Sequence, residues 1–470
     1  MSHAFPGRDL APPVSVPCMF QSLSNLISEE GVSTVMVDHK IIRDSVHGSI
    51  RVDSEFLPLA EAPELQRLHS IHQLGLAYLV YPGANHTRFE HSLGTFAVAG
   101  RMCDSLGLEP GEVRLVRAAA FLHDIGHLPY SHTFEMVLHE QFGIDHAEIS
   151  QRLIRGEDTV LTEAESRVLG KHVSVPEAIE RMGMDPREVA RLLEGGAAQG
   201  PAKGLDRHKG QAHFNSKRYL SQIVSGTVDA DQLDYLVRDA HYTGVAYGVI
   251  DLDRLVETFD VFNGDLVIER GGLSAVEGML VARSLMFTSV YFHKTVRISE
   301  LMLAKAVEGF GPEDIYSMHQ MTDATLLSRL DSEGGLCGEI ATLIKYRRLF
   351  KKAYALAVTD VAEGQWDTID RLGDMKRRRM VEEEIATRAG LEPGHVIMDV
   401  PSSELPVSEP RMCLTDVRIL QQKKVRLLPK ISPIAAALQT RRAHDWAVMV
   451  ACPERHKAKV AKAAEKVLGL

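Results

Sequence analysis

Apolar residues recur every three or four positions along most of this chain, and this periodicity constrains its fold more than any other feature. Five segments carry the pattern, at residues 59–71, 89–106, 112–125, 147–154 and 273–307. Segments of this kind fold as amphipathic helices that bury their apolar faces against one another. The sequence therefore predicts a mainly α protein built around a bundle of helices.

The pattern changes along the chain, and at 470 residues we expect more than one structural unit. Residues 1–39 hold several prolines and little periodicity, which predicts an N-terminal arm. Residues 40–395 form the expected helical core, with two short strands near its start and a hairpin at Asn263-Gly264. Residues 396–470 read as strand, helix, strand and helix, which predicts a small α+β appendage.

Charge and cysteine usage narrow the class of protein. The formal net charge of −10 argues against a surface adapted to coat nucleic acid, so nucleic-acid binding stays open only for the basic runs 345–352 and 376–379. The five cysteines show no paired spacing, which is typical of a reducing compartment. The sequence shows no signal peptide and no run that approaches the length of a membrane span. We therefore expect a cytoplasmic protein that does not associate with membranes.

An adjacent histidine and carboxylate, His123 and Asp124, follow the apolar run 118–122 and precede Gly126. This order places two polar side chains at the end of a buried helix, where they need partners or a metal ion to offset desolvation. Adjacent residues on a helix diverge by about 100°. The pair can therefore reach one ion only near a helix end, and Gly126 supplies the break.

Two further residues extend this pair into a candidate metal site. His91 lies upstream in a predicted helix, and Asp231 lies downstream in an acidic run. A helical histidine taken alone is more often a packed or surface residue than a ligand. Two imidazoles and two carboxylates together suit Mn, Fe, Mg or Zn. Such a cation polarises phosphoryl oxygens and makes a bound water nucleophilic near neutral pH, so the set predicts a metal-dependent phosphohydrolase.

Histidines cluster downstream of this pair, with five of the chain's 21 between residues 123 and 146. One interpretation is a polar patch of solvated histidines. The other is an active site, in which the Glu135 carboxylate keeps the His146 imidazole charged enough to protonate a leaving oxygen.

These motifs resemble the HD-domain phosphohydrolase superfamily, and more narrowly its dNTP triphosphohydrolases. The resemblance runs from about Lys40 to the C-terminus and rests on motifs at residues 44–48, 66–68, 73–75, 81–84, 88–94, 123–127 and 234–239. It implies an HD-domain helical bundle that hydrolyses dNTPs to deoxynucleoside and triphosphate. It also implies metal ligation by His91, His123, Asp124 and Asp231, and catalytic roles for His146, Glu135 and His127.

The resemblance implies a substrate site made of Arg88, His132, Gln73, Leu74, Tyr235, Asp239 and Tyr291. Arg88 would bind phosphate through its guanidinium fork, and His132 would lie near the phosphates. Gln73 and Leu74 would border the sugar, with Tyr235 and Asp239 beside its 3′-hydroxyl. Tyr291 would lie against the ring carbon that lacks a 2′-hydroxyl, where a close aromatic ring excludes ribonucleotides.

The sequence departs from the family's pattern at two places. Gln232 stands where the family has a phosphate-binding lysine, and Lys294 and Arg283 are candidate replacements. The expected site for an activating nucleotide is only partly matched, by Lys40, Glu61, Gln66, His69 and Arg254. Glu61 replaces an aspartate there and His69 replaces an arginine.

Three functions remain in view from the sequence. The first is a dNTP triphosphohydrolase that forms homo-oligomers, dimers or tetramers. The second is an HD phosphohydrolase that acts on another nucleotide phosphoester, which the Gln232 departure keeps open. The third is a nucleotide-sensing oligomeric scaffold, in which nucleotide binding drives subunit assembly and hydrolysis is incidental.

Overall fold

The computed structural model describes residues 38–130, 133–134, 143–194, 217–310, 316–401, 415–441 and 445–470. The predicted fold class is confirmed, because helices dominate and a few small sheets accompany them. The expected N-terminal arm lies almost entirely outside the described residues. The domain boundary expected at residue 396 stays a prediction.

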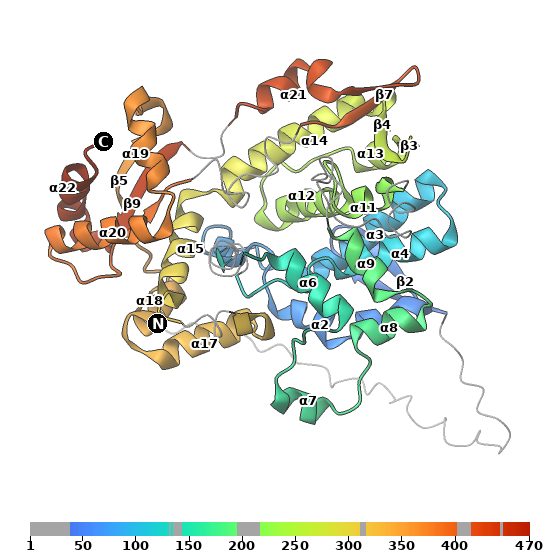
Figure 1. Ribbon diagram of the computed structural model, residues 1–470, viewed down its shortest axis with the longest axis horizontal. Helices are drawn as coiled ribbons and strands as arrows, with labels where there is room; N and C mark the ends of the chain where they lie inside the picture. Colours follow the sequence, from blue (N-terminus) through green and yellow to red (C-terminus); the bar gives the residue numbers. More distant parts are fainter. Residues whose placement is uncertain are drawn as a thin grey trace, which may run out of the picture. The chain divides into compact units, whose positions relative to one another are not determined.

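Three helices form the part of the core that carries the candidate site: α3 (Arg88–Leu106), α4 (Pro110–Leu122) and α12 (Ala230–Thr243). α3 packs against both α4 and α12 (Figure 1). A capping box between Thr87 and Glu90 begins α3, and Gly107 ends it with a φ of +60°. Phe96 and Phe121, both fully buried, join α3 to α4 with ring centroids 4.9 Å apart.

Shorter helices lie before, between and after these three along the chain. They are α1 (Leu57–Ala60), α2 (Pro63–Gln66), α6 (His146–Arg155), α7 (Glu163–Leu169), α8 (Val175–Arg181), α9 (Pro186–Leu192), α11 (Arg218–Val224) and α13 (Leu252–Glu257). The continuous apolar face expected over 59–71 is divided, because Pro63 begins a new helix and Arg67–Ser70 tighten into a 3-10 turn.

The segment expected to be helical over 273–307 is also divided, into α14 (Leu273–Met286), a π-helical turn (Phe287–Tyr291) and α15 (Lys294–Val307). Among the described residues, Arg270–Tyr291 is long and apolar enough to cross a membrane, with a mean hydropathy of 1.3. This run contradicts the expectation that no segment approaches the length of a membrane span. Half of that window is buried inside the protein, where α14 packs against α12, α13 and α21 (Pro433–Leu438).

Two antiparallel hairpins form as expected. β1 (His39–Asp44) pairs with β2 (Gly48–Asp53) around a turn in which Gly48 has a φ of +77°. β3 (Phe259–Phe262) pairs with β4 (Asp265–Glu269). Asn263 and Gly264 join these strands with φ of +53° and +79°, which is the conformation that Asn-Gly hairpin turns favour.

The C-terminal segment divides between two sheets. Two of its strands, β7 (Arg418–Gln421) and β8 (Lys424–Leu427), extend the second hairpin into a sheet of order β3-β4-β7-β8, with β7 parallel to β4. α21 follows and lies along α14 (Figure 1). This half of the segment therefore belongs to the same sheet as the hairpin of the helical core.

The remaining strands form a separate three-stranded sheet. β9 (Trp446–Cys452) lies between β5 (Lys351–Ala357) and β6 (Ile397–Asp399), antiparallel to both. Ala447, Val448, Val450 and Cys452 of β9 form a separate cluster with apolar side chains of α20 (Met375–Ala389) and α22 (Lys457–Leu468), whereas Met449 and Ala451 belong to the main core. Three further helices belong to this part of the chain: α17 (Asp323–Glu333) and α18 (Gly335–Lys345) precede β5, and α19 (Trp366–Arg371) follows it. β5 interrupts the helical pattern expected up to residue 395, and its exposed Lys351 and Lys352 end the basic run 345–352.

Candidate metal centre

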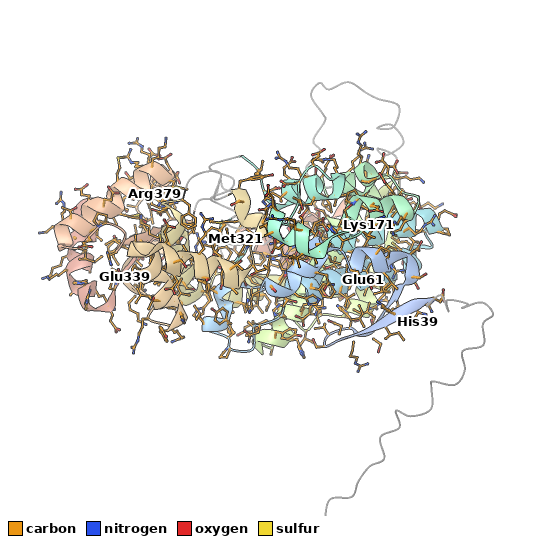
Figure 2. All side chains as sticks on the ribbon, turned by 90° about the horizontal axis from the view of Figure 1, so that it is seen from below. His39, Glu61, Lys171, Met321, Glu339 and Arg379 are labelled. Atoms are coloured by element: carbon orange, nitrogen blue, oxygen red, sulfur yellow. The ribbon has the colours of Figure 1, made fainter. Side chains whose placement is uncertain are left out.

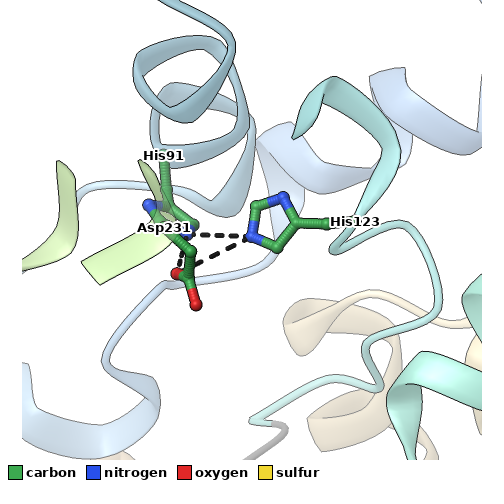
Figure 3. A group of neighbouring side chains, drawn as sticks. All are labelled: His91, His123 and Asp231. Atoms are coloured by element: carbon green, nitrogen blue, oxygen red, sulfur yellow. Dashed lines mark hydrogen bonds and ion pairs between the residues drawn. The ribbon is translucent and has the colours of Figure 1, made fainter. Parts of the chain in front are cut away.

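Side chains from three helices converge at the place that the sequence predicts for a metal ion (Figure 3). His91 projects from the first turn of α3, and His123 follows the last residue of α4. Asp231 is the second residue of α12. Because α3 packs between α4 and α12, residues remote in sequence meet at its N-terminal end.

Nitrogen and oxygen atoms of the four predicted ligands lie close together. His91 Nε2 lies 3.2 Å from His123 Nε2 and 3.1 Å from Asp231 Oδ1. Asp124 Oδ1 lies 3.1 Å from His123 Nε2, and Asp124 Oδ2 lies 3.8 Å from His91 Nε2. Ligand atoms bound about 2.0–2.2 Å from one ion are about 3 Å from each other. These separations and this mixed donor set therefore fit a divalent cation.

The end of α4 allows His123 and Asp124 to approach the same point. α4 ends at Leu122, and His123 Nδ1 lies 2.8 Å from the carbonyl oxygen of Ala120. A hydrogen bond from Nδ1–H to this carbonyl leaves Nε2 as the metal-binding nitrogen. The two side chains, which would diverge by about 100° within a helix, therefore approach the same point because the helix ends between them and Leu122.

Gly126 allows the start of α6 to pack directly against this turn. A Cβ atom at Gly126 would lie 2.3 Å from the backbone nitrogen of Ser150 and 2.4 Å from the carbonyl oxygen of His146. The buried Ser150 hydroxyl accepts from Gly126 N at 2.9 Å and donates to the His123 carbonyl at 2.8 Å. The close approach places His146, the first residue of α6, beside the histidine–aspartate turn.

Arg88 and Asp124 form a buried ion pair at this site. Arg88 Nη1 donates to Asp124 Oδ2 at 2.6 Å, and the two residues are 2% and 4% exposed. Burial raises the pKa of Asp124, but the charges of His123, His127 and Arg88 outweigh it and hold that pKa well below its ordinary value. Asp124 is therefore an ionised carboxylate, as metal ligation requires.

His127 and His146 stack on each other beside Asp124, with ring centroids 3.9 Å apart and planes inclined by 14°. His127 Nε2 lies 3.1 Å from Asp124 Oδ1. Burial, together with the charges of Arg88 and His146, outweighs the attraction of Asp124 and holds the pKa of His127 well below its ordinary value. The other two predicted residues of this region, Glu135 and His132, lie outside the described residues.

The protein's own groups bias His91 toward its charged form. Burial lowers the pKa of His91, but hydrogen bonds with Asp231 and Asp234 and the charges of Asp234 and Asp124 outweigh it and raise that pKa to about 10. Binding of a divalent cation at His91 therefore requires the loss of one proton.

The residues expected at the sugar also meet. Tyr291 Oη donates to Asp239 Oδ2 at 2.7 Å, and the ring of Tyr235 lies edge-on to that of Tyr291. Gln73 is 6% exposed, and its Oε1 is buried with no hydrogen-bond partner among the described residues. Leu74, next in sequence, is also buried. A buried amide oxygen of this kind is suited to accept a hydrogen bond from a ligand hydroxyl.

His86, which no sequence pattern singled out, links the two halves of the expected sugar site. His86 Nε2 lies 2.8 Å from Asp239 Oδ1, and the His86 carbonyl accepts from the backbone nitrogen of Gln73 at 3.0 Å. The only feature of the sequence that points to His86 is its position two residues before Arg88.

Gln232 is held by protein groups. Its Oε1 accepts from Arg283 Nη1 at 2.7 Å, and its Nε2 donates to the Gly226 carbonyl at 3.2 Å. Both Gln232 and Arg283 are buried. Lys294, the other candidate replacement cation, is exposed at the start of α15. Of the two, Arg283 is the cation that the structure places against Gln232.

The residues of the expected activator site are only partly brought together. Lys40 Nζ lies 2.7 Å from Glu61 Oε1 at the surface, and Figure 2 shows Glu61 near His39, which precedes Lys40. Gln66 donates to the Ala60 carbonyl at 2.7 Å. Two more residues complete the expected set: His69, stacked on Phe89, and Arg254, which donates to the Gly271 carbonyl.

Comparisons with known proteins agree with this geometry. The HD domain family matches residues 88–195, and the HD associated region matches residues 250–470. A protein of Methanocaldococcus jannaschii is 32% identical over 426 residues, covering 88% of this chain and 79% of its own length. The chain belongs to the HD-domain family of phosphohydrolases.

Two further proteins place the chain within this family. Human deoxynucleoside triphosphate triphosphohydrolase SAMHD1 is 28% identical over 355 residues, which are 66% of this chain and 54% of the human protein. The chain thus spans about half the length of that relative. A crystal structure of a phosphohydrolase from Bacteroides thetaiotaomicron is 25% identical, with a TM-score of 0.61, and covers 88% of this chain and 100% of that one.

Proposed function

We propose that this protein is a metal-dependent hydrolase that converts a dNTP to a deoxynucleoside and inorganic triphosphate. The observation that carries the proposal is the meeting of His91, His123, Asp124 and Asp231 beside the buried cation Arg88. The similarity to SAMHD1 supports the choice of dNTPs among nucleotide substrates.

One face of α12 joins the proposed metal site to the proposed sugar site. Asp231, Tyr235 and Asp239 follow one another at intervals of four residues, so their side chains project from the same side of the helix. Eight residues of helix span about 12 Å. A nucleotide with its phosphates near Asp231 and its sugar near Asp239 therefore matches the order of these side chains.

The proposed reaction adds water to the α-phosphorus and breaks its bond to the 5′-oxygen. A divalent cation held by the four ligands would polarise the phosphoryl oxygens and make a water molecule more acidic. Arg88 neutralises charge on the phosphates through its guanidinium group. His146, beside Asp124 and His127, donates a proton to the departing 5′-oxygen. Glu135 would support that imidazole.

Selection of the deoxy sugar would rest on Tyr291 and Asp239. Their 2.7 Å hydrogen bond fixes the tyrosine ring, and Tyr235 lies edge-on to it. Gln73 offers a buried acceptor for a sugar hydroxyl. A ring fixed in this way leaves little room for a 2′-hydroxyl, so ribonucleotides would be poor substrates.

The environment of Gln232 favours one alternative, an HD phosphohydrolase that acts on a nucleotide with fewer phosphates. Gln232 and Arg283 are tied to each other in the interior, so a flexible lysine that could follow a long phosphate chain is replaced by a fixed pair. A monophosphate or another phosphoester would need fewer cations than a triphosphate.

Product analysis separates these candidates. The purified protein would be loaded in turn with Mn²⁺, Fe²⁺, Mg²⁺ or Zn²⁺ and supplied with dNTPs, NTPs and nucleoside monophosphates. We expect triphosphate and deoxynucleoside in equal amounts from dNTPs. Release of orthophosphate or pyrophosphate instead would overturn the proposal, and Asp124→Ala serves as the inactive control.

We also infer that the protein forms homo-oligomers and that nucleotides modulate their assembly. Lys40 and Glu61 offer a charged surface pair where the resemblance implies an activating nucleotide, and this supports the inference. Gel filtration with and without GTP or dNTPs, alongside turnover measurements, tests it. Nucleotide-driven assembly without turnover would favour a sensing scaffold.

A further inference from the structure

Asp234, on α12, is a fully buried carboxylate next to the proposed metal site. It lies 2.7 Å from His91 Nδ1 and 2.6 Å from His47 Nε2. Arg238 donates to it as well, from Nε at 2.8 Å and from Nη2 at 3.0 Å. Nothing in the motif pattern assigned these contacts a role.

The contacts determine where the protons of both imidazoles lie. An ionised carboxylate only accepts hydrogen bonds, and its two oxygens have room for four donors. Arg238 fills two of these positions, and the imidazoles fill the other two as Nδ1–H of His91 and Nε2–H of His47. His91 therefore presents its Nε2 to His123 and Asp231, as a metal ligand must.

The same network reaches the turn between β1 and β2. Arg238 Nη1 donates to Asp44 Oδ2 at 2.8 Å, so one buried guanidinium lies between two buried carboxylates. Asp44 Oδ1 accepts from the backbone nitrogens of Val46 and His47 at 2.9 and 2.7 Å. These bonds shape the turn that directs His47 toward Asp234.

Gly94 on α3 makes room for the network. A Cβ atom there would lie 1.9 Å from Asp234 Oδ1 and 2.4 Å from Arg238 Nη2. Any larger residue would push the Asp234 carboxylate away from α3, the helix that carries His91. The close packing of α3 on α12 at this glycine is therefore part of the same arrangement.

We propose that Asp234 is a positioning residue, which holds His91 with Nε2 toward the metal and makes metal affinity depend on the β1–β2 turn through His47 and Asp44. The inference rests on the proposed metal site. Asp234 itself would touch neither substrate nor cation. Residues that hold a metal-binding histidine in this way usually contribute 10- to 100-fold to metal affinity.

The test measures metal binding without substrate. Calorimetric titration of the metal-depleted full chain with Mn²⁺ gives a Kd, and the absorption spectrum of the Co²⁺ form reports ligand geometry. For Asp234→Asn we expect a Kd about 10- to 100-fold weaker and an altered Co²⁺ spectrum. For His47→Gln we expect weaker binding near the lower end of that range, because Asp234 keeps its bonds to His91 and Arg238.

Asp239→Asn is the matched control. Asp239 is also a buried carboxylate of α12 bonded to an imidazole, that of His86, and among the described residues it makes no hydrogen bond or ion pair with His91. We expect this variant to keep the wild-type Mn²⁺ Kd and Co²⁺ spectrum and to lose substrate affinity. Circular dichroism establishes whether each variant is folded. If Asp234→Asn is unfolded, the Mn²⁺ affinity of His47→Gln tests the inference instead.

The outcomes distinguish this inference from the proposed function. Wild-type Mn²⁺ affinity in both Asp234→Asn and His47→Gln would overturn the inference and leave the hydrolase intact. A wild-type protein that binds Mn²⁺ but releases no triphosphate from dNTPs would overturn the proposed function alone. A wild-type protein that binds no divalent cation would overturn both.

Discussion

Arg88 Nη1 lies 2.6 Å from Oδ2 of Asp124, so a buried guanidinium is bonded directly to a proposed metal ligand. The two residues come from different helical segments, the first turn of α3 and the turn after α4. Their pairing keeps a positive charge at the place where phosphate oxygens would bind, and it fixes the direction of the Asp124 carboxylate.

Arg88→Ala should lower kcat about 10²- to 10³-fold, because a fixed charge-stabilising donor is lost at the phosphates. All four proposed metal ligands remain, so the variant should still bind Mn²⁺. The kcat of Arg88→Lys should lie between those of the wild type and Arg88→Ala, since lysine keeps the charge and lacks the forked guanidinium group. Steady-state kinetics with metal analysis would check this, and wild-type turnover in Arg88→Ala would exclude a phosphate-binding role.

His91→Ala and Asp124→Ala should lose bound metal and activity together. His146→Ala should retain metal and lose about 10²- to 10⁴-fold in turnover, the usual contribution of a general acid. Metal content by mass spectrometry, measured beside dNTP turnover, separates the two effects. A fully active His146→Ala protein on every substrate tested would show that another group donates the proton.

Tyr291→Phe should raise KM for dNTPs, because it removes the hydrogen bond to the Asp239 carboxylate. Loss of a buried bond to a charged group costs about 1–3 kcal/mol, or about 5- to 150-fold. Tyr291→Ala should also reduce discrimination against ribonucleotides by opening space at the sugar. The ratio of kcat/KM for dATP to that for ATP measures this discrimination, and Tyr354→Phe in β5 is a control far from the sugar. An unchanged ratio in Tyr291→Ala would refute the role of Tyr291 in excluding ribonucleotides.

Gly126→Ala should separate α6 from the histidine–aspartate turn, because the added Cβ would meet Ser150 N and the His146 carbonyl oxygen. Overpacking of this kind costs about 1–3 kcal/mol of stability. Turnover should fall further than stability alone explains, since His146 moves with the helix. Urea unfolding and dNTP turnover of Gly126→Ala, compared with those of Gly111→Ala, where a Cβ meets nothing within 4 Å, would check both effects.

Glu300 should make the protein less stable as pH rises from about 4.5 to 7. Burial, and then the charge of Asp399, raise its pKa from 4.5 to about 7 against the opposing charge of Arg297. In that window the folded state binds more protons than the unfolded state, so stability falls with pH. The shift corresponds to about 3 kcal/mol above pH 7.

Glu300→Gln should therefore be more stable than the wild type at pH 8 by up to about 3 kcal/mol and should differ little from it at pH 4.5. Urea unfolding at both pH values measures the difference. The exposed Glu257→Gln is the control and should change stability little at either pH. An equal gain at both pH values would mean that titration of Glu300 is not its source.

Local patterns in the sequence were enough to predict the elements that depend on neighbouring residues. The apolar periodicity of α3 and α4 and the Asn263-Gly264 turn are properties of short segments, and the structure contains all three. The meeting of His91, His123, Asp124 and Asp231 was predicted from their types of ligand atom and from a resemblance in motif order, because spacing alone does not bring remote helices together. Their roles remain predictions.

Other features depend on packing between distant segments and leave no local signal. The partners His47 and Asp234 are 187 residues apart, and they meet only because the β1–β2 turn lies against α12. The parallel pairing of β4 with β7 joins Ile268 to Ile419. The π-helical turn at Phe287–Tyr291 is likewise hidden within a continuous apolar pattern.

The parallel pairing of β7 with β4 has a practical consequence for shortened versions of this protein. A chain that stops before residue 415 would leave the backbone N–H and C=O groups along one side of β4 exposed to solvent. Bare strand edges recruit other chains, so such a fragment should aggregate during expression. Residues 415–441 therefore need to be retained in any truncation meant to isolate the catalytic region.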